Sequence, residues 1–148
     1  MFGRIVVGTD GSDTAAEAVR QAVELAKLSG ARLDIVSAFE PIPQQRIRQE
    51  ARDAPADVQY EINAREDVNL ILEGSLGDAK KGGIEDVQTH AREGDPADAI
   101  LDVAEEIKAD AVVVGNKGMT GARRFLLGSV PNKVSHHAPC SVIIIRTT

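Results

Sequence analysis

The stretch that decides the fold spans residues 111–130 and reads AVVVGNKGMTGARRFLLGSV. It opens with a continuous apolar run, which predicts a central strand covered on both faces. Four glycines then fall within fourteen residues, at Gly115, Gly118, Gly121 and Gly128. A strand that enters a glycine-rich turn and then a helix is typical of a phosphate site, because free N–H groups and the helix dipole point at the anion. At this stage glycines that only make tight turns are the alternative.

Outward from this stretch the chain alternates between strand and helix patterns. Short β-branched runs predict strands at 4–9, 31–39, 111–114 and 141–146, and a weaker, polar strand near an edge at 84–93. Helical spacing predicts helices after Ser12 or Asp13, over 57–82, from Asp95-Pro96, and over 130–138. Strands that alternate with helices imply a parallel sheet covered on both faces. We therefore predict one α/β domain over residues 1–148 with an open five-stranded parallel sheet.

Two segments qualify this fold prediction. Asp34 lies within the second predicted strand, where its charge indicates a strand end or a less covered face. Residues 40–57 hold three of the six prolines and many charges, which predicts an exposed loop.

Two polar or glycine-rich turns directly follow predicted strands: one at residues 9–12 and the other at 115–130. In open parallel sheets ligands sit outside the carboxyl ends of the strands, where strand order reverses. Both turns should lie on that edge, which favours a ligand site over simple turns. Asp10 could contact the ligand or hydrogen-bond its own backbone in an Asx turn, and the two roles are compatible.

The spacing of the glycines narrows the kind of phosphate site. The Walker A pattern is absent, because Lys117 precedes Gly118 and lacks the following hydroxyl, and the dinucleotide pattern G-x-G-x-x-G is absent as well. The chain instead has G-x2-G-x9-G-S, from Gly115 through Gly118 to Gly128-Ser129. Such a loop can fold over a ligand and return to a helix start, where Ser129 and Val130 offer N–H groups to a phosphate.

Composition excludes several classes of function. The formal charge of -6 and the pI near 5.1 give no footprint for a polyanion, so nucleic acid is not an expected partner. The few aromatic residues argue against platforms for base stacking, and the apolar runs are far too short for a membrane span. The lone Cys140 cannot form an intramolecular disulfide, which indicates a cytoplasmic chain, and we expect it to be a small buried hydrophobe.

Three segments carry a resemblance to the universal stress protein family: VVGTDGS at 6–12, VVVGNKG at 112–118 and LLGSVPNKVSHHAPCSVIII at 126–145. The resemblance covers essentially the whole chain and implies the family's α/β fold, related to that of the adenine nucleotide α-hydrolases. In the branch with this glycine spacing it implies bound ATP, which Mg²⁺ can accompany. The matching positions implied for the nucleotide are Gly8, Thr9, Asp10, Ala38, Val114, Gly115, Gly118, Gly128, Ser129 and Val130.

The resemblance also implies which part of the nucleotide each of these positions would contact. Asp10 would lie near the base or ribose, the backbone of Ala38 at the adenine edge, and the glycine loop with Ser129 at the ribose and phosphates. The GSVP ending of the loop and Thr147-Thr148 look most like a small actinobacterial-type subgroup that also binds cyclic AMP. Residues 41–56 match no family pattern.

Members of this family commonly pair through the last strand, here Ser141 to Arg146, which implies a homodimer. An apolar final strand fits an edge that needs cover. The same strand could equally be covered within the monomer.

The function these observations favour is a regulatory module in the stress response that holds ATP, or cyclic AMP, without rapid turnover. No residue is an evident general base and no acidic pair is well spaced for Mg²⁺, so we assign no catalytic residue. The alternative is a slow ATPase or a phosphoryl or nucleotidyl transferase in which Asp10 or Ser129 participates. A dimeric scaffold with a structural nucleotide or none is a third reading. No metal site is assigned, because His136 and His137 are adjacent on a helix and face different directions.

Overall fold

The computed structural model describes residues 2–39, 64–116 and 127–147. Its elements are β1 (Arg4–Gly8), α1 (Asp13–Ser29), β2 (Arg32–Phe39), α4 (Ala64–Lys81), β3 (Val87–Glu93), α5 (Pro96–Ile107), β4 (Ala111–Gly115), α6 (Ser129–His137) and β5 (Ser141–Ile145). The strands form one sheet in the order β3-β2-β1-β4-β5, and every pairing is parallel. The predicted α/β fold with five parallel strands is confirmed. The predicted loop at 40–57 and the first turns of the helix predicted over 57–82 lie outside the described residues.

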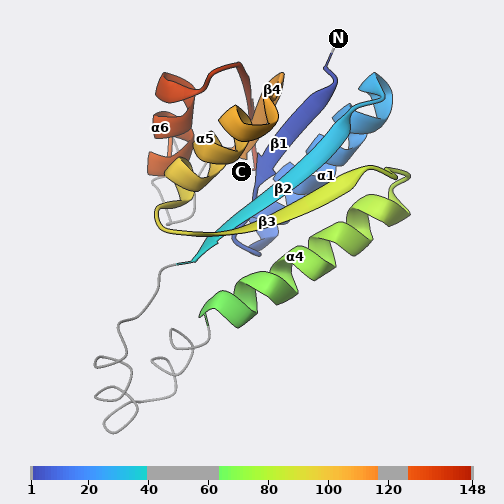
Figure 1. Ribbon diagram of the computed structural model, residues 1–148, viewed down its shortest axis with the longest axis horizontal. Coiled ribbons are helices and arrows are strands. Elements are labelled where there is room, and N and C mark those ends of the chain that lie inside the picture. The colour runs from blue at the N-terminus through green and yellow to red at the C-terminus, as the bar shows by residue number, and fades with distance from the viewer. Residues whose placement is uncertain (1, 40–63, 117–126, 148) are drawn as a thin grey trace, which may run out of the picture.

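Helices cover both faces of the sheet, α1 and α4 on one and α5 and α6 on the other (Figure 1). Side chains alternate between the faces along each strand, so the sheet supplies two separate cores. In β1, Ile5 and Val7 pack towards α1 and α4, while Val6 packs towards α5 and α6. Strand order reverses between β1 and β4, since the chain moves from β1 outward to β3 and then returns to the far side of β1.

Capping side chains explain where two of the helices begin. Ser12 caps α1 by accepting a hydrogen bond from the backbone N–H of Ala15 at 3.2 Å, which decides between the two candidates, Ser12 and Asp13. Asp95 caps α5 in the same way, with Pro96 in the first turn, as predicted. At the other end of α1, Gly30 takes the left-handed conformation at φ 68°, which suits glycine and ends the helix.

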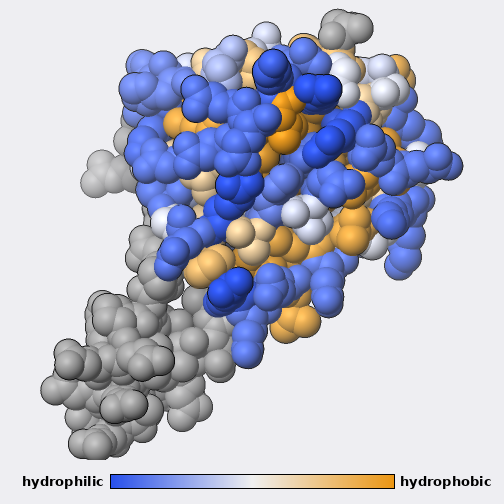
Figure 2. All heavy atoms as spheres, in the orientation of Figure 1, coloured by the Kyte–Doolittle hydropathy of each residue, from blue (hydrophilic) through white to orange (hydrophobic). Residues whose placement is uncertain are grey.

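The two edge strands differ in character. β3 carries exposed polar side chains such as Gln88 and Thr89, which confirms the prediction of a weak strand near an edge. β5 is apolar at four of its five positions, yet Ile144 is 40% exposed. The face of the molecule drawn in Figure 2 is mainly hydrophilic, with smaller apolar areas between the charged side chains. Among the described helices, none combines the length and the hydropathy that crossing a bilayer would require.

Asp34 corrects one expectation, because its side chain is fully buried rather than at a strand end or on a less covered face. β2 lies inside the sheet, between β1 and β3, so a residue in its middle has no access to solvent. The carboxylate accepts hydrogen bonds from Arg32, at 2.8 Å from Nε and 2.9 Å from the second guanidinium nitrogen, and from Nε2 of His90 on β3 at 2.7 Å. Burial alone would raise the pKa of Asp34, but the hydrogen bonds from His90 and Arg32 outweigh it and lower the pKa. The buried charge is tolerated because it is paired on both sides.

We expect Asp34→Ala to lower the free energy of unfolding by about 2–4 kcal/mol at pH 7, because it removes the acceptor that pairs Arg32 and His90. Glu85→Ala, which removes an exposed acid just before β3, is the matched control and should leave stability unchanged. Urea denaturation followed by circular dichroism measures both.

Wild type and Asp34→Ala, compared over a range of pH, test whether the charge of Asp34 contributes to stability. The pKa of Asp34 is lower in the folded than in the unfolded chain. The stability that the ionised carboxylate contributes is therefore fully present above the unfolded pKa of about 4, and it is lost as pH falls through the folded pKa. The stability difference between wild type and Asp34→Ala should therefore shrink in strong acid. A difference that does not change with pH would mean that Asp34 acts through packing alone.

Candidate functional site

A cleft lies at the carboxyl ends of β1 and β4, the neighbouring strands at which strand order reverses. Open α/β sheets bind ligands at this position. The walls come from strand ends, from the first turns of α1 and α6, from α5 and from the segment after β5. The lining residues are Gly8, Asp10, Thr14, Ala15, Ile100, Val114, Gly115, Val130, Pro131 and Thr147.

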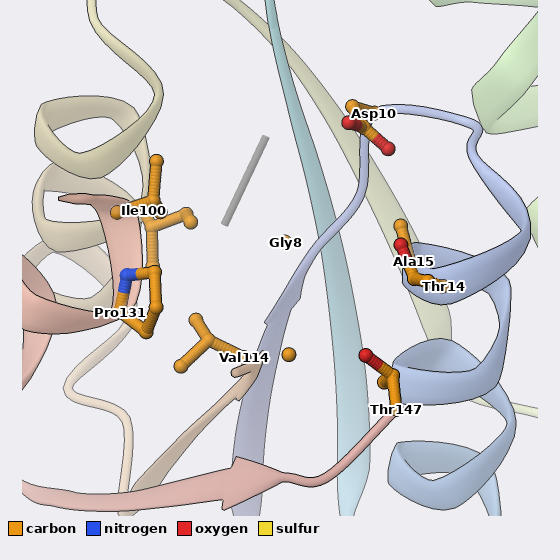
Figure 3. Close-up of a pocket in the computed structure, with 10 residues that line it drawn as sticks. Gly8, Asp10, Thr14, Ala15, Ile100, Val114, Pro131 and Thr147 are labelled. Carbon is orange, nitrogen blue, oxygen red and sulfur yellow. The ribbon is translucent and has the colours of Figure 1, made fainter. Parts of the chain in front are cut away.

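The two sides of the cleft differ chemically (Figure 3). Ile100, Val114 and Pro131 form an apolar wall on one side, and Asp10 and Thr147 stand with Thr14 on the other. Gly8 lies between the walls and adds no side chain. A cleft of this kind suits a ligand that is flat and apolar on one face and carries polar groups on the other.

Hydrogen bonds hold the turn that follows β1. The backbone N–H of Ser12 donates to Oδ1 of Asp10 at 2.9 Å, so the Asx turn is present while Asp10 also lines the cleft. Thr9 is buried, its N–H donates to the carbonyl of Val36 at 2.9 Å, and its Oγ1 accepts from the N–H of Gly11 at 3.1 Å. These contacts fix the direction of the chain as it leaves the strand, and with it the position of the Asp10 carboxylate.

The start of α6 places the backbone N–H groups of a first helical turn beside the cleft. Gly128 is the N-cap and makes no side-chain capping bond, in contrast to Ser12 of α1 and Asp95 of α5. The N–H of Gly128 already donates to the carbonyl of Asn116 at 2.9 Å. The N–H groups of Ser129 and Val130 have no acceptor within the helix, because they belong to its first turn. These two N–H groups, rather than that of Gly128, are placed to meet an anion.

The structure brings together five of the ten residues implied for the nucleotide. Those that line the cleft are Gly8, Asp10, Val114, Gly115 and Val130. The others lie around it or away from it. Gly128 and Ser129 stand at the start of α6, and Ala38 lies at the end of β2 on the α5 face of the sheet without lining the cleft. Thr9 instead lines a groove between α1 and α4, and Gly118 lies outside the described residues.

Five lining residues were not in that set: Thr14, Ala15, Ile100, Pro131 and Thr147. Ile100 reads in the sequence as an ordinary core position of α5, and it is indeed 1% exposed. Its place in the cleft depends on how α5 crosses the sheet, which periodicity alone does not indicate. Thr14 and Ala15 lie in the first turn of a helix that follows a strand at the switch point, and that position is the signal that could have revealed them.

The enclosed part of the cleft measures about 20 Å³, room for about one water molecule. A larger ligand would therefore lie across its open mouth or part its walls. The α1–α4 groove is larger, about 600 Å³, and acidic side chains including Asp13, Glu24 and Asp78 line it. We nevertheless take the cleft as the candidate site, because only the cleft joins the switch point to the start of α6.

Two reactive side chains lie outside the lining of the cleft: Lys133 on α6, and Cys140 just before β5, at the opposite edge of the sheet. Lys133 of α6 contacts Asp98 at 2.8 Å and Asp95 at 3.4 Å, which ties α6 to α5 and raises the pKa of the lysine. Cys140 is half-buried, and burial raises the pKa of its thiol, which does not suit a nucleophile. Among the described residues no group of three His, Cys, Asp or Glu could hold a metal ion.

Comparison with known proteins places this geometry in a family. The model of the universal stress protein family matches residues 1–146. A universal stress protein of Mycobacterium tuberculosis is 38% identical over 147 residues, which cover 99% of this chain and 98% of the relative. Two solved structures are similar in fold. A universal stress protein in complex with cAMP gives a TM-score of 0.76 at 36% identity, with 99% of both chains covered. One from Archaeoglobus fulgidus in complex with dAMP gives 0.68 at 28% identity, with 97% of both covered.

Two glycines beside the site provide a matched pair of variants. A Cβ on Gly115 would lie 3.6 Å from Thr147 and 4.0 Å from Ala18, which are ordinary contacts, so Gly115→Ala should change stability by less than about 0.5 kcal/mol. Gly11 has φ +82° and its Cβ would lie 2.8 Å from Ile71, so Gly11→Ala should cost more than about 1 kcal/mol. Urea denaturation compares them, and an equal or reversed order would contradict the geometry of this edge.

Proposed function

The chain belongs to the universal stress protein family, and on that premise we propose that it binds ATP or cyclic AMP in the cleft between β1 and β4, as a regulatory module of the stress response in the cytoplasm. The observation that carries the proposal is the juxtaposition of an apolar wall with the uncapped start of α6 at the switch point of the sheet. The cAMP and dAMP bound by structural neighbours support an adenine nucleotide as the class of ligand.

The charges around the cleft give the nucleotide an orientation. The carboxylate of Asp10 repels phosphate and accepts hydrogen bonds from hydroxyl or amino groups, so the nucleoside belongs on its side. The N–H groups of Ser129 and Val130 and the dipole of α6 favour the phosphate at the opposite end. The adenine ring would lie between the two walls, with one face on Ile100 and Val114, which offer apolar contact without competing donors, and its polar edge towards Asp10.

We favour retention of the nucleotide over its hydrolysis. Asp10, the one carboxylate that lines the cleft among the described residues, already accepts from the N–H of Ser12. This bond fixes the side chain as part of a turn. Slow hydrolysis or group transfer with Asp10 or Ser129 stays the alternative, and single-turnover assays with radiolabelled ATP separate it from binding alone.

The proposal includes a homodimer that forms through β5 and extends to Arg146. Within the part of the chain that the structure describes, β5 is paired on one side only, with β4, and no strand covers its other edge. Its apolar side chains are half-buried or exposed, a combination that a soluble sheet edge usually covers. A second copy would cover the backbone edge and Ile144 together.

Calorimetry with ATP and with cyclic AMP tests the nucleotide site. We expect wild type to bind at least one of the two, and Gly128→Val to lose at least tenfold in affinity while it stays folded. Gly128 has an ordinary φ of -64° that valine adopts, and the added side chain would stand beside the N–H groups that meet the phosphate. Gly77→Ala, which meets nothing within 4 Å, is the control and should bind as wild type does. No binding by wild type at millimolar nucleotide would overturn the proposal.

Sedimentation velocity tests the dimer. Ile144→Lys places a charge on the exposed apolar position of the edge strand and should shift the protein to monomer. Leu28→Lys is the matched control, because Leu28 is 85% exposed on α1 and is not part of β5. A wild type that is monomeric at all concentrations would contradict the dimer. A dimer that Ile144→Lys leaves intact would mean that the interface lies elsewhere than β5.

A further inference from the structure

Asn116, the residue after β4, joins three segments around the cleft. Its Oδ1 accepts two hydrogen bonds from Thr147, one from the backbone N–H at 2.8 Å and one from Oγ1 at 2.9 Å. Its own N–H donates to the carbonyl of Ile145, and its carbonyl accepts from the N–H of Gly128, both at 2.9 Å. One residue therefore connects the end of β4, the segment after β5 and the start of α6.

The side chain of Asn116 is what holds Thr147 in the wall of the cleft. The ladder between β4 and β5 ends with Gly115 opposite Ile145, so Thr147 lies beyond the strand pairing. Its Cγ2 nevertheless sits 3.6 Å from where a Cβ on Gly115 would be, and it lines the cleft. Its two bonds to the side chain of Asn116 hold the chain where it turns inward at this point.

The same bonds fix the direction of the Thr147 hydroxyl hydrogen. A backbone N–H can only donate, so the atom of Asn116 that receives it must be the carboxamide oxygen and not the nitrogen. That oxygen can only accept, so the hydroxyl of Thr147 donates to it. The lone pairs of Oγ1 are then left to accept, and Figure 3 shows this hydroxyl turned toward the cleft, on the same side as Asp10.

We propose that Thr147 is a specificity-determining residue of the nucleotide site, positioned by Asn116 to accept a hydrogen bond from an N–H or O–H donor of the nucleoside. With Asp10 it gives the polar wall two acceptors, which select a ribose hydroxyl or the adenine amino group and disfavour phosphate. The inference rests on the proposed nucleotide site and adds which functional groups of the ligand that site reads.

Calorimetry with a series of analogues tests the acceptor. On wild type we expect one of 2′-deoxy-ATP, 3′-deoxy-ATP and ITP, which replaces the amino group with a carbonyl, to bind more weakly than ATP. Thr147→Val removes the acceptor at nearly constant shape. It should lower the affinity for ATP about three- to tenfold and abolish the difference in affinity between ATP and the analogue that wild type binds more weakly. Thr147→Ser keeps the hydroxyl and should have the affinity for ATP and the selectivity of wild type. Thr89→Val on β3 should change neither the affinity nor the selectivity. A Thr147→Val protein with the wild-type affinity and selectivity would overturn the proposal.

Amide hydrogen exchange, measured by NMR without nucleotide, tests the positioning role. Asn116→Ala should speed exchange at the Thr147 amide at least tenfold, while Asn116→Asp, which keeps an acceptor, should stay near wild type. Unchanged exchange in Asn116→Ala would overturn this role. If wild type bound no nucleotide, the proposed function and the ligand contact would fail together, whereas accelerated exchange would still show that Asn116 holds Thr147.

Discussion

The parallel pairing of β1 with β4 is the constraint on which the rest of the molecule depends. It joins residues more than a hundred positions apart, with Ile5 opposite Ala111 and Val7 opposite Val113. At the start of both strands Oδ2 of Asp110 accepts from the N–H groups of Gly3 and Arg4, at 2.8 and 2.9 Å, which anchors the pair at the edge away from the cleft. With that edge fixed, the other ends of the two strands lie side by side, and Gly8 of β1 and Gly115 of β4 both line the cleft.

Much of this architecture could be predicted from the sequence, because it follows from local rules. Apolar runs predicted the strands, caps such as Asp95-Pro96 predicted helix starts, and alternation predicted the parallel sheet and the edge at which the candidate cleft is found. Asp34 shows where local rules end. A charge within a strand indicates exposure, and only the register of β2 against β3 brings His90 to its carboxylate. Charge pairing between strands depends on register, which a single sequence does not display.

The candidate site divides in the same way. Asp10, Gly115 and Val130 follow directly from their places after strands or at a helix start. Ile100 and Thr147 do not, because one enters the cleft through the crossing of α5 over the sheet and the other through hydrogen bonds made beyond the end of β5. Residues that reach a site through tertiary contacts have no recognisable local sequence pattern. Each wall of the cleft therefore contains one residue, Ile100 or Thr147, that can be assigned to it only from the folded structure.

Alternation along β1 has a consequence for how this protein can vary in length. Gly8 opens the cleft on one face of the sheet while Thr9, the next residue, is buried against the other. Inserting or deleting one residue in β1 would turn the following side chains to the opposite faces of the sheet. The hydroxyl of Thr9 would then stand where the cleft needs open backbone, and Val6 and Val7 would each point into the core that the other now occupies. Conservative substitutions within β1 leave the register intact. The number of residues in this strand is therefore more tightly constrained than their identity.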